Sequence, residues 1–391
     1  MIAFWVCNNN QLINSVNLKL HYYKDMPADL YVRTNIISEE LISIINNNAI
    51  FENIIFLEYP LLSAKKVKFG SHLIFRVLFS YKLRTHYYQN YLNQLTNTKN
   101  YDHLFVAGFW ADSIYLIDYF SKINTKLQVS FFDEGTSSLY FTKRKFLWYF
   151  PAANWRNKCY AIYTEFLLRL KHSKRFDGKL YLYPQDIYKA DNKIIVMRLP
   201  KITDDNFLCK KIILNGFDME DSSILDYRYS HCKVCYLATP PTPSYEENYS
   251  RTYQILDEIS ECCSTKELII KPHPTNTDHR KKFAQQYEVS AYVDRQLYFF
   301  ERLFLTVDFN NKVLISRNSS SLFYAKAVYG QEPYIIFTFR LYPYYHQFGE
   351  DSTEEYAQDI KAMYDHPEKI FIPNTIMELR MILRRLLRNE N

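Results

Sequence analysis

Glycine is scarce in this chain, which has seven glycines and 14 prolines in 391 residues. Long apolar runs are missing too. No stretch of 18 apolar residues occurs, so we expect no membrane-spanning helix. The apolar start at residues 2–7 is too short for a secretory signal and follows no basic segment. These absences favour a globular chain of the cytoplasm over an integral membrane protein or a secreted one.

Neither a disulfide framework nor a zinc site is indicated. The seven cysteines are odd in number, which fits a reducing compartment better than a set of paired bridges. Cys232 and Cys235 form one C-x-x-C, but no second pair follows at zinc spacing, so we interpret them as buried strand cysteines. The net charge of +6 suits anionic partners but is too small to predict nucleic-acid binding.

Apolar runs that alternate with amphipathic stretches predict an α/β fold. Such alternation builds parallel sheets covered by helices, and we expect two Rossmann-type domains facing a central cleft, at 1–205 and 206–391. A basic aromatic insertion at about 140–180 interrupts the first domain. The clearest strands are expected at 2–7, 53–59, 103–109 and 127–133, and at 233–238, 267–271, 312–316 and 334–337.

The stretch Lys271-Pro-His-Pro274 follows a predicted buried strand. The two prolines restrict the backbone, so His273 is held in one place, as a phosphate partner or a general acid requires. Lys271 adds positive charge beside it. The alternative is a turn with an incidental histidine, which is how we interpret the second His-Pro, at His366.

Polar loops follow other predicted strands at their carboxyl ends, where parallel sheets place ligands. Asn318 precedes three serines at the start of a predicted helix, whose free N–H groups and dipole attract anions. Simple helix capping needs only one serine. The first strand is followed by another polar run, which includes Asn10 and Gln11.

Acidic residues mark two further positions. Asp133, Glu134 and Gly135 end a predicted buried strand, where adjacent acids favour a raised pKa and general-base work; a turn acid capping the next helix is the alternative. Glu301 lies between the His273 and serine loops, where its carboxylate can accept both ribose hydroxyls of a nucleotide. A solvated helix glutamate is the competing interpretation.

Taken together, these four segments resemble the motifs of bacterial sialyltransferases. Asp133-Glu134-Gly135 is similar to their acidic motif, His273-Pro274 to their HP motif, and Ser319-Ser320-Ser321 to their serine motif. In its opening NNNQLINSVNL and in its length, the chain most resembles glycosyltransferase family 52, the lipooligosaccharide and capsule sialyltransferases. The resemblance implies a GT-B-like fold, a CMP-sialic acid donor and inversion at the anomeric carbon.

The resemblance also implies roles for individual residues. His273 would contact or protonate the departing CMP phosphate, the three serines would hold that phosphate, and Glu301 would hold the ribose. Asp133 matches the acidic motif that supplies the base. Family 52 also implies an aspartate in the loop after the first strand of the second domain; it is missing here, and Glu246 or Glu247 are the substitutes. No D-x-D triplet occurs, so we expect no metal and no cofactor.

Other functions share part of this pattern. A CDP-glycerol or CDP-ribitol phosphotransferase of the teichoic-acid type resembles the chain in the K-x-H-P, glutamate and serine segments. A UDP-sugar glycosyltransferase of the same family and a non-catalytic glycan-binding member are further alternatives. The acidic turn at Asp133 favours the sialyltransferase, with a terminal galactose of a glycan or glycolipid as acceptor.

Two segments suit an anionic membrane surface. Residues 142–175 carry nine Lys or Arg against one acid, among aromatic residues, and 375–391 combines arginines with an apolar face. We therefore expect a cytoplasmic protein that can bind the inner face of a bacterial cytoplasmic membrane. The alternatives are a core-packed helix for 375–391 and a helical hairpin between domains for 142–175. A homodimer is compatible with the sequence.

Overall fold

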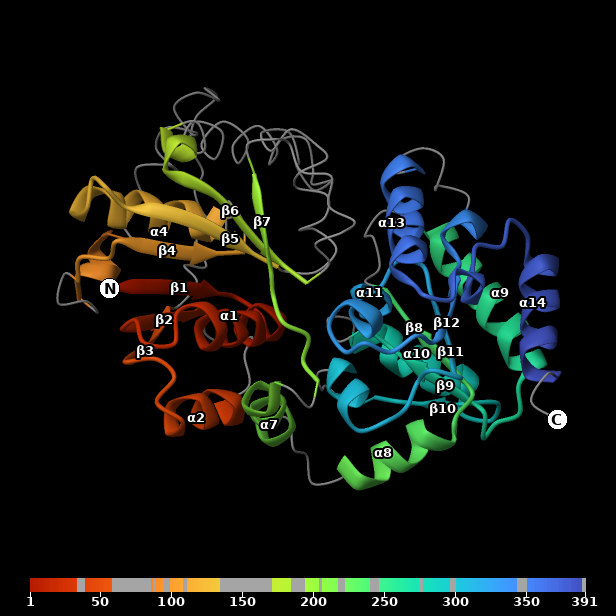
Figure 1. The fold of residues 1–391 in the computed structure, drawn as a ribbon. Helices are drawn as coiled ribbons and strands as arrows, with labels where there is room; N and C mark the ends of the chain where they lie inside the picture. The colour runs from red at the N-terminus through yellow and green to blue at the C-terminus, as the bar shows by residue number, and fades with distance from the viewer. Residues whose placement is uncertain are drawn as a thin grey trace, which may run out of the picture. The chain divides into compact units, whose positions relative to one another are not determined.

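The computed structural model divides the chain into two compact units, residues 1–200 and 201–391, coloured red to yellow-green and green to blue in Figure 1. The division lies five residues before the boundary expected from the sequence at 205. The structure describes residues 1–33, 39–57, 86, 89–94, 99–107, 111–133, 171–183, 194–203, 206–216, 222–239, 246–273, 277–295, 300–342 and 350–388.

The first unit is built on a seven-stranded parallel sheet in the order β3-β2-β1-β4-β5-β6-β7. Its strands are β1 (Ile2–Val6), β2 (Ala28–Arg33), β3 (Asn53–Leu57), β4 (His103–Val106), β5 (Gln128–Phe132), β6 (Phe176–Leu182) and β7 (Ile195–Arg198). Its helices are α1 (Asn9–Tyr22), α2 (Glu39–Asn47), α4 (Ala111–Ile123) and the short η1 (Ser173–Arg175).

Because successive side chains of a strand point to opposite faces, the first sheet has an apolar core on each face. Trp5 and Val106 pack with Ile117 and Phe120 of α4 on one face of the sheet. Phe4 points the other way and stacks on Phe105 at 4.7 Å between ring centroids. The strands are thus apolar on both faces, which is why they read as continuous apolar runs in the sequence.

The second unit repeats the plan with six parallel strands in the order β10-β9-β8-β11-β12-β13. They are β8 (Val234–Leu237), β9 (Leu268–Lys271), β10 (Tyr292–Val293), β11 (Val313–Ser316), β12 (Tyr334–Phe337) and β13 (Ile370–Phe371). The longer helices are α7 (Phe207–Gly216), α8 (Ser222–His231), α9 (Glu246–Cys262), α10 (Thr277–Tyr287), α11 (Ser320–Ala327), α13 (Glu350–Met363) and α14 (Ile376–Arg388). Short 3-10 turns are η3 (Phe300–Leu305), η4 (Phe339–Leu341) and η5 (Pro367–Lys369).

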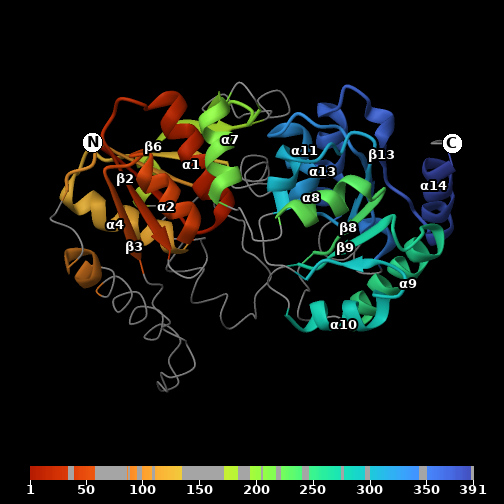
Figure 2. The same ribbon diagram turned by 90° about the horizontal axis from the view of Figure 1, so that it is seen from below.

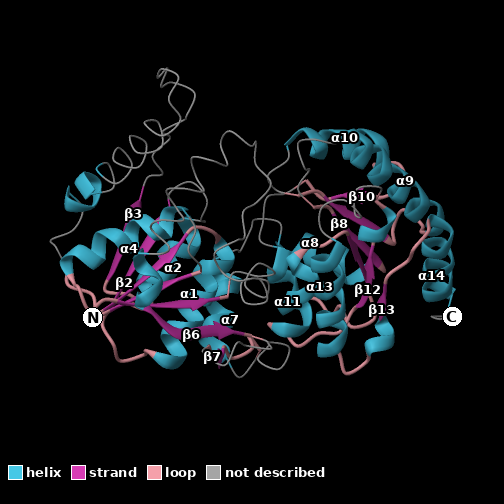
Figure 3. Ribbon diagram, turned by 90° about the horizontal axis from the view of Figure 1, so that it is seen from above, coloured by secondary structure: helices cyan, strands magenta, loops and turns pink. Residues whose placement is uncertain are grey.

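Helices cover both faces of this second sheet. Helices α9, α10 and α14 lie on one face and α8, α11 and α13 on the other (Figures 2 and 3). Ile255 and Ile259 of α9 pack with Leu379 and Leu383 of α14 and with the strand residue Ile270. The opposite face carries α11 and η3, which contain the serine turn and Glu301.

Helix α14 is the basic helix predicted at 375–391. Arg380 hydrogen-bonds Glu258 and Glu261 of α9, and the Arg385 guanidinium lies 5.2 Å from the ring centroid of Phe371. Leu383 is buried. The helix therefore uses its apolar face and part of its charge within the unit, and contact with a membrane stays a prediction. None of the helices in the described part of the chain combines the length and apolar character needed to cross a bilayer.

Both sheets have the strand order 3-2-1-4-5-6 of a doubly wound fold, with β7 added at the edge of the first. The chain order reverses between β1 and β4 and between β8 and β11. In such sheets, ligands bind at the carboxyl ends of the strands beside these reversal points. The predicted α/β fold with two Rossmann-type parallel-sheet units is confirmed.

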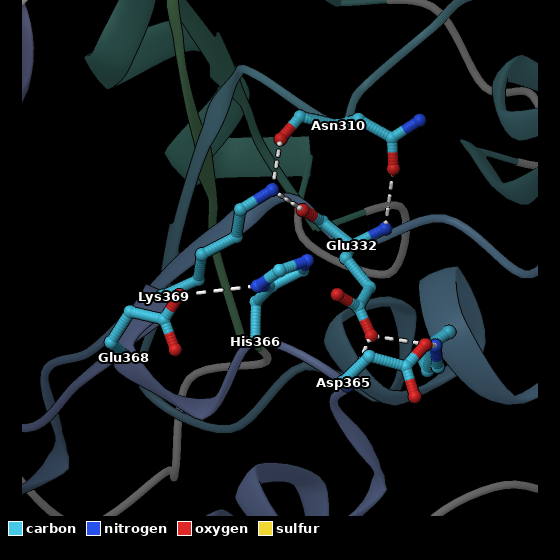
Figure 4. A network of polar contacts seen from close by, with 7 residues as sticks. Asn310, Glu332, Asp365, His366, Glu368 and Lys369 are labelled. Carbon is cyan, nitrogen blue, oxygen red and sulfur yellow. Dashed lines mark hydrogen bonds and ion pairs between the residues drawn. The ribbon is translucent and has the colours of Figure 1, made fainter.

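The amino edge of the second sheet is closed by a polar network (Figure 4). Lys369 Nζ donates to the carbonyl oxygens of Asn310 and Glu332, each at 3.0 Å. The Glu332 carboxylate lies 2.6 Å from Lys326 Nζ and accepts from the backbone N–H of Asp365, also at 2.6 Å. These bonds tie together the turns that enter β11, β12 and β13. His366, of the second His-Pro, also lies at this amino edge, which is at the opposite end of the strands from the carboxyl edge.

Candidate functional site

His273 lies at the carboxyl end of β9, as predicted. Pro272 is buried and His273 is half-buried, and burial lowers the pKa of the imidazole below its usual value. The ring is therefore neutral near pH 7, and a bound phosphate would raise its pKa again by placing negative charge beside it. Pro274 lies outside the described residues.

The serine turn lies at the carboxyl end of β11 and is fixed by a chain of hydrogen bonds. Ser316 Oγ donates to the carbonyl oxygen of Leu237 at 2.7 Å, and accepts from the backbone N–H of Ser319 at 3.2 Å. Ser319 is the N-cap of α11, and its Oγ accepts from the N–H of Ser321. Tyr356 Oη donates to the Ser319 carbonyl at 3.0 Å. The turn is thus held from both sides, with the helix N-terminus at the sheet edge.

Only one of the three serines is needed for capping. Ser321 is buried and its Oγ donates to Glu301 Oε1 at 2.8 Å, whereas Ser320 is partly exposed and Asn318 is exposed. The turn therefore combines a cap, a contact to a carboxylate, and exposed groups available to a ligand.

Glu301 is a buried carboxylate on η3, with 6% of its surface exposed. Burial raises the pKa of this carboxyl, and the Ser321 hydrogen bond and the positive charge of Lys271 oppose that rise. Its neighbour Arg302 forms an ion pair with Asp226 of α8 at 3.1 Å, which fixes η3. A glutamate that is buried without a close ion pair costs stability, as groups in binding sites often do.

The His273 turn and the serine turn lie at the same edge of one sheet. Strand β8 alone separates β9 from β11, so the two turns are about 10 Å apart, or two strand spacings. Glu301 stands beside the serine turn, 2.8 Å from Ser321. Three segments separated by up to 50 residues in the chain thus converge where a doubly wound sheet binds its ligand.

Lys271 forms a buried ion pair that could not be predicted from the sequence. Its Nζ lies 3.2 Å from Asp294 Oδ2, and Tyr229 Oη donates to the same oxygen at 2.8 Å. Asp294 follows β10, a strand of two residues, which is too short to be found from an apolar pattern. Nothing in the sequence marked Asp294 or Tyr229.

In the first unit, the polar run after β1 caps α1. Gln11 is buried, and its Oε1 accepts from the backbone N–H of Cys7 at 2.8 Å. Asn8 is the N-cap, with Oδ1 accepting from the N–H of Gln11. Asn10 is partly exposed in the first turn. Gln11 thus has a structural contact at the position where the sequence predicted substrate binding.

The predicted base residues are only partly described. Asp133 directly follows β5 and is fully buried; its backbone N–H donates to the Tyr181 carbonyl, and its own carbonyl accepts from Asn14 Nδ2 at 2.8 Å. Glu134 and Gly135 lie outside the described residues. Glu246 and Glu247 begin α9, but their side chains are outside the described part of the structure.

No metal site is found in the residues whose placement is described: none of their His, Cys, Asp and Glu side chains form a group of three or more. Cys232 and Cys235 are both buried, with their sulfurs 3.3 Å apart. Cys235 lies in β8, as predicted, whereas Cys232 lies in the turn between α8 and β8.

Comparison with known proteins decides the family. The model of the family described as "Alpha-2,8-polysialyltransferase (POLYST)" matches residues 4–336, most of the chain. The chain belongs to the alpha-2,8-polysialyltransferase family. It is therefore a glycosyltransferase of the sialyltransferase type. Family 52, which the sequence most resembles, is not the family that this match names, but the sialyltransferase character is the same.

Solved structures agree on the fold. A UDP-glucose: anthocyanidin 3-O-glucosyltransferase in complex with UDP superposes with a TM-score of 0.57 at 11% identity, covering 99% of this chain and 89% of that one. The UDP-GlcNAc 2-epimerase of Methanocaldococcus jannaschii gives 0.52 at 11% identity, with 99% and 93% covered. At such identities the likeness shows the GT-B fold alone. No curated protein sequence matches the chain significantly.

Because Glu301 is buried, replacing its carboxylate with a neutral group should stabilise the protein. Because the folded pKa of this carboxyl is raised, the native state loses stability as pH rises from the unfolded pKa through the folded pKa. Glu301→Gln should therefore raise the melting temperature at pH 7.5, and the gain should be smaller at pH 4.5, because the raised pKa favours the neutral Glu301 carboxyl at low pH. Calorimetry at both pH values measures this.

Glu258→Gln is the matched control, since Glu258 is also buried but is hydrogen-bonded to Arg380. This change should lower the melting temperature at pH 7.5. A lower melting temperature for Glu301→Gln at pH 7.5 would contradict the interpretation that the buried Glu301 carboxylate costs stability.

Proposed function

We propose that the protein is an inverting sialyltransferase that transfers sialic acid from CMP-sialic acid to the terminal sugar of a bacterial surface glycan. The observation that carries this proposal is the hydrogen bond between Glu301 and the serine turn at the carboxyl edge of the second sheet, where only strand β8 separates this turn from the His273 turn. This edge offers, side by side, groups suited to a phosphate and a carboxylate suited to a ribose.

The serine turn and His273 suit the donor phosphate. The first turn of α11 presents backbone N–H groups and the positive end of the helix dipole, and Ser320 adds an accessible hydroxyl. His273 is neutral in the free protein because burial lowers the pKa of its imidazole. The negative charge of the bound donor phosphate would raise the imidazole pKa, so that His273 takes up a proton from water. The protonated ring would then neutralise the departing CMP phosphate or donate this proton to it.

Glu301 suits the ribose of the nucleotide. An ionised carboxylate has acceptor positions for both ribose hydroxyls, and Ser321 occupies only part of one oxygen. A hydrogen bond to a charged acceptor contributes about 1.5–3 kcal/mol. The binding of a nucleotide would thus use the carboxylate that costs stability in the free protein.

The reaction requires one bond to break and one to form. The bond between the anomeric carbon of sialic acid and the CMP phosphate oxygen breaks, and its electron pair stays with CMP. An acceptor hydroxyl oxygen bonds to the anomeric carbon from the opposite face, and a base takes its proton. We propose Asp133, with Glu134 beside it, as the base, and Glu246 and Glu247 as the alternative.

The family match supports one class of acceptor. The family description names an alpha-2,8-polysialyltransferase, which favours an acceptor that ends in sialic acid. The sequence alone predicted galactose. We therefore propose a terminal sialic acid as the acceptor, carried on a glycan or glycolipid, with galactose as the second candidate.

A donor and acceptor panel tests this function. The full chain would be incubated with CMP-sialic acid, CDP-glycerol, CDP-ribitol and UDP-glucose, each with acceptors ending in sialic acid or in galactose. We expect transfer from CMP-sialic acid to the sialic acid terminus, seen as an added residue by mass spectrometry. Transfer from a CDP- or UDP-linked donor instead would refute the assignment.

Replacing the imidazole should slow transfer more than it weakens binding. His273→Ala should lower kcat for sialyl transfer at least 100-fold, while CMP affinity falls by less than tenfold, because the imidazole acts mainly on the leaving phosphate. His366→Ala, at the second His-Pro, is the matched control and should keep full activity. Normal turnover by His273→Ala would remove this residue from the mechanism.

Substitutions at each candidate base show which one accepts the acceptor proton. Asp133→Asn should lower kcat by about 100-fold or more if Asp133 accepts the acceptor proton, with little change in KM for the donor. The double variant Glu246→Ala and Glu247→Ala should then stay within a few-fold of the wild-type rate. The opposite pattern would assign the base to α9, and no loss in either variant would reject both.

A further inference from the structure

The ion pair between Lys271 and Asp294 is the least expected feature of the carboxyl edge. Lys271 is 6% exposed and Asp294 is fully buried, and their charged atoms lie 3.2 Å apart. Tyr229 Oη donates to the same Asp294 oxygen at 2.8 Å, and the backbone N–H of Asp294 donates to the Ile270 carbonyl. A charge pair in this setting is costly unless its geometry is held on several sides.

The strand register explains why the pair forms. Val293 lies opposite Ile270 in the parallel ladder, so Asp294 and Lys271 come next in line at the carboxyl ends of β10 and β9. Ile270 and Val293 face the core that α9, α10 and α14 cover. Because side chains alternate, Lys271 and Asp294 face the other side of the sheet, which carries α8, α11 and η3.

That other side also carries Glu301, on η3. The Lys271 charge acts on the Glu301 carboxyl, where it favours the ionised form against the effect of burial. The other charged groups on this face are Asp294, which pairs with Lys271, and the Arg302–Asp226 pair between η3 and α8. His273, two residues after Lys271, completes the edge.

We propose that Asp294 is a positioning residue of the donor site: it holds the Lys271 ammonium inside the fold, where the lysine supports the charge of Glu301 without occupying its oxygens. Lys271 then serves the ribose through Glu301 and does not bind the donor phosphate. This inference rests on the proposed function, because it gives Glu301 the ribose to bind.

Lys271 and Asp294 affect Glu301 in different ways. Without Lys271, Glu301 would lose the positive charge that opposes the effect of burial, and the pKa of its carboxyl would rise further. Without the Asp294 charge, the ammonium would turn toward Glu301 and occupy the oxygens that the ribose needs. The buried pair thus keeps Glu301 both ionised and accessible.

Comparison of CMP with deoxy-CMP tests the proposal, because only the ribose differs. In calorimetric titrations of the full chain at pH 7, the wild type should bind CMP about tenfold or more tightly than deoxy-CMP. Lys271→Met and Asp294→Asn should each bring this ratio close to one, mainly by weakening CMP. In Lys271→Met the ratio should increase as the pH is raised above 7, because a higher pH favours the ionised Glu301 carboxylate; in Asp294→Asn it should not.

Glu332→Gln is the matched control, since it breaks another buried ion pair of the same unit, at the amino edge of the sheet (Figure 4). It should lower the melting temperature and leave the ratio of the two affinities unchanged. If Lys271→Met instead weakens CMP and deoxy-CMP by the same factor, Lys271 contacts the phosphate and the proposal is wrong.

A ligand-free measurement separates this proposal from the proposed function. The pKa of Glu301 can be followed by carbon NMR of the chain labelled at glutamate side-chain carboxyls, with Glu301→Gln to assign the signal. Lys271→Met should raise this pKa and Asp294→Asn should lower it. If the wild type binds neither nucleotide, the function fails, but these opposite shifts would still support the charge arrangement. A Glu301 pKa that moves in neither variant would overturn it.

Discussion

The hydrogen bond from Ser321 to Glu301 is the contact on which the candidate site depends. It joins η3 to the first turn of α11 at 2.8 Å, in a place shielded from water. A carboxylate in such a place is unstable unless donors and a nearby positive charge support it. Ser321 supplies the donor and Lys271 the charge, so the serine turn and the strand end at β9 act on one group.

The parallel sheet makes this convergence possible. Because all strands of the second unit run in one direction, every loop that leaves a strand emerges at the same edge. The amino edge is closed by the network around Lys369 and Glu332, which holds the entering turns in place. The polar network and the candidate site thus lie at opposite ends of the same strands, and a change at one end need not disturb the other.

Much of the second unit could be predicted from the sequence, since β8, β9 and β11 are apolar runs that end in polar loops. The loops with His273 and the serines were found because strand ends are where such sheets bind ligands. β10 and β13 were missed, because two residues carry no periodicity. The Lys271–Asp294 pair was missed for the same reason, since it depends on the register of β10. Gln11 shows where sequence cannot distinguish two roles, because fixing the start of a helix and binding a ligand require the same polar residues; its role in substrate binding stays a prediction.

A crystal structure of the full chain with CMP would test the central claim most directly, which is that the His273 turn and the serine turn bind one nucleotide. The account predicts phosphate oxygens within hydrogen-bond distance, about 3 Å, of both the His273 ring and donors of the Ser319–Ser321 turn, with the ribose hydroxyls on Glu301. A phosphate bound at only one of these turns, or CMP bound away from the carboxyl edge of the second sheet, would contradict it.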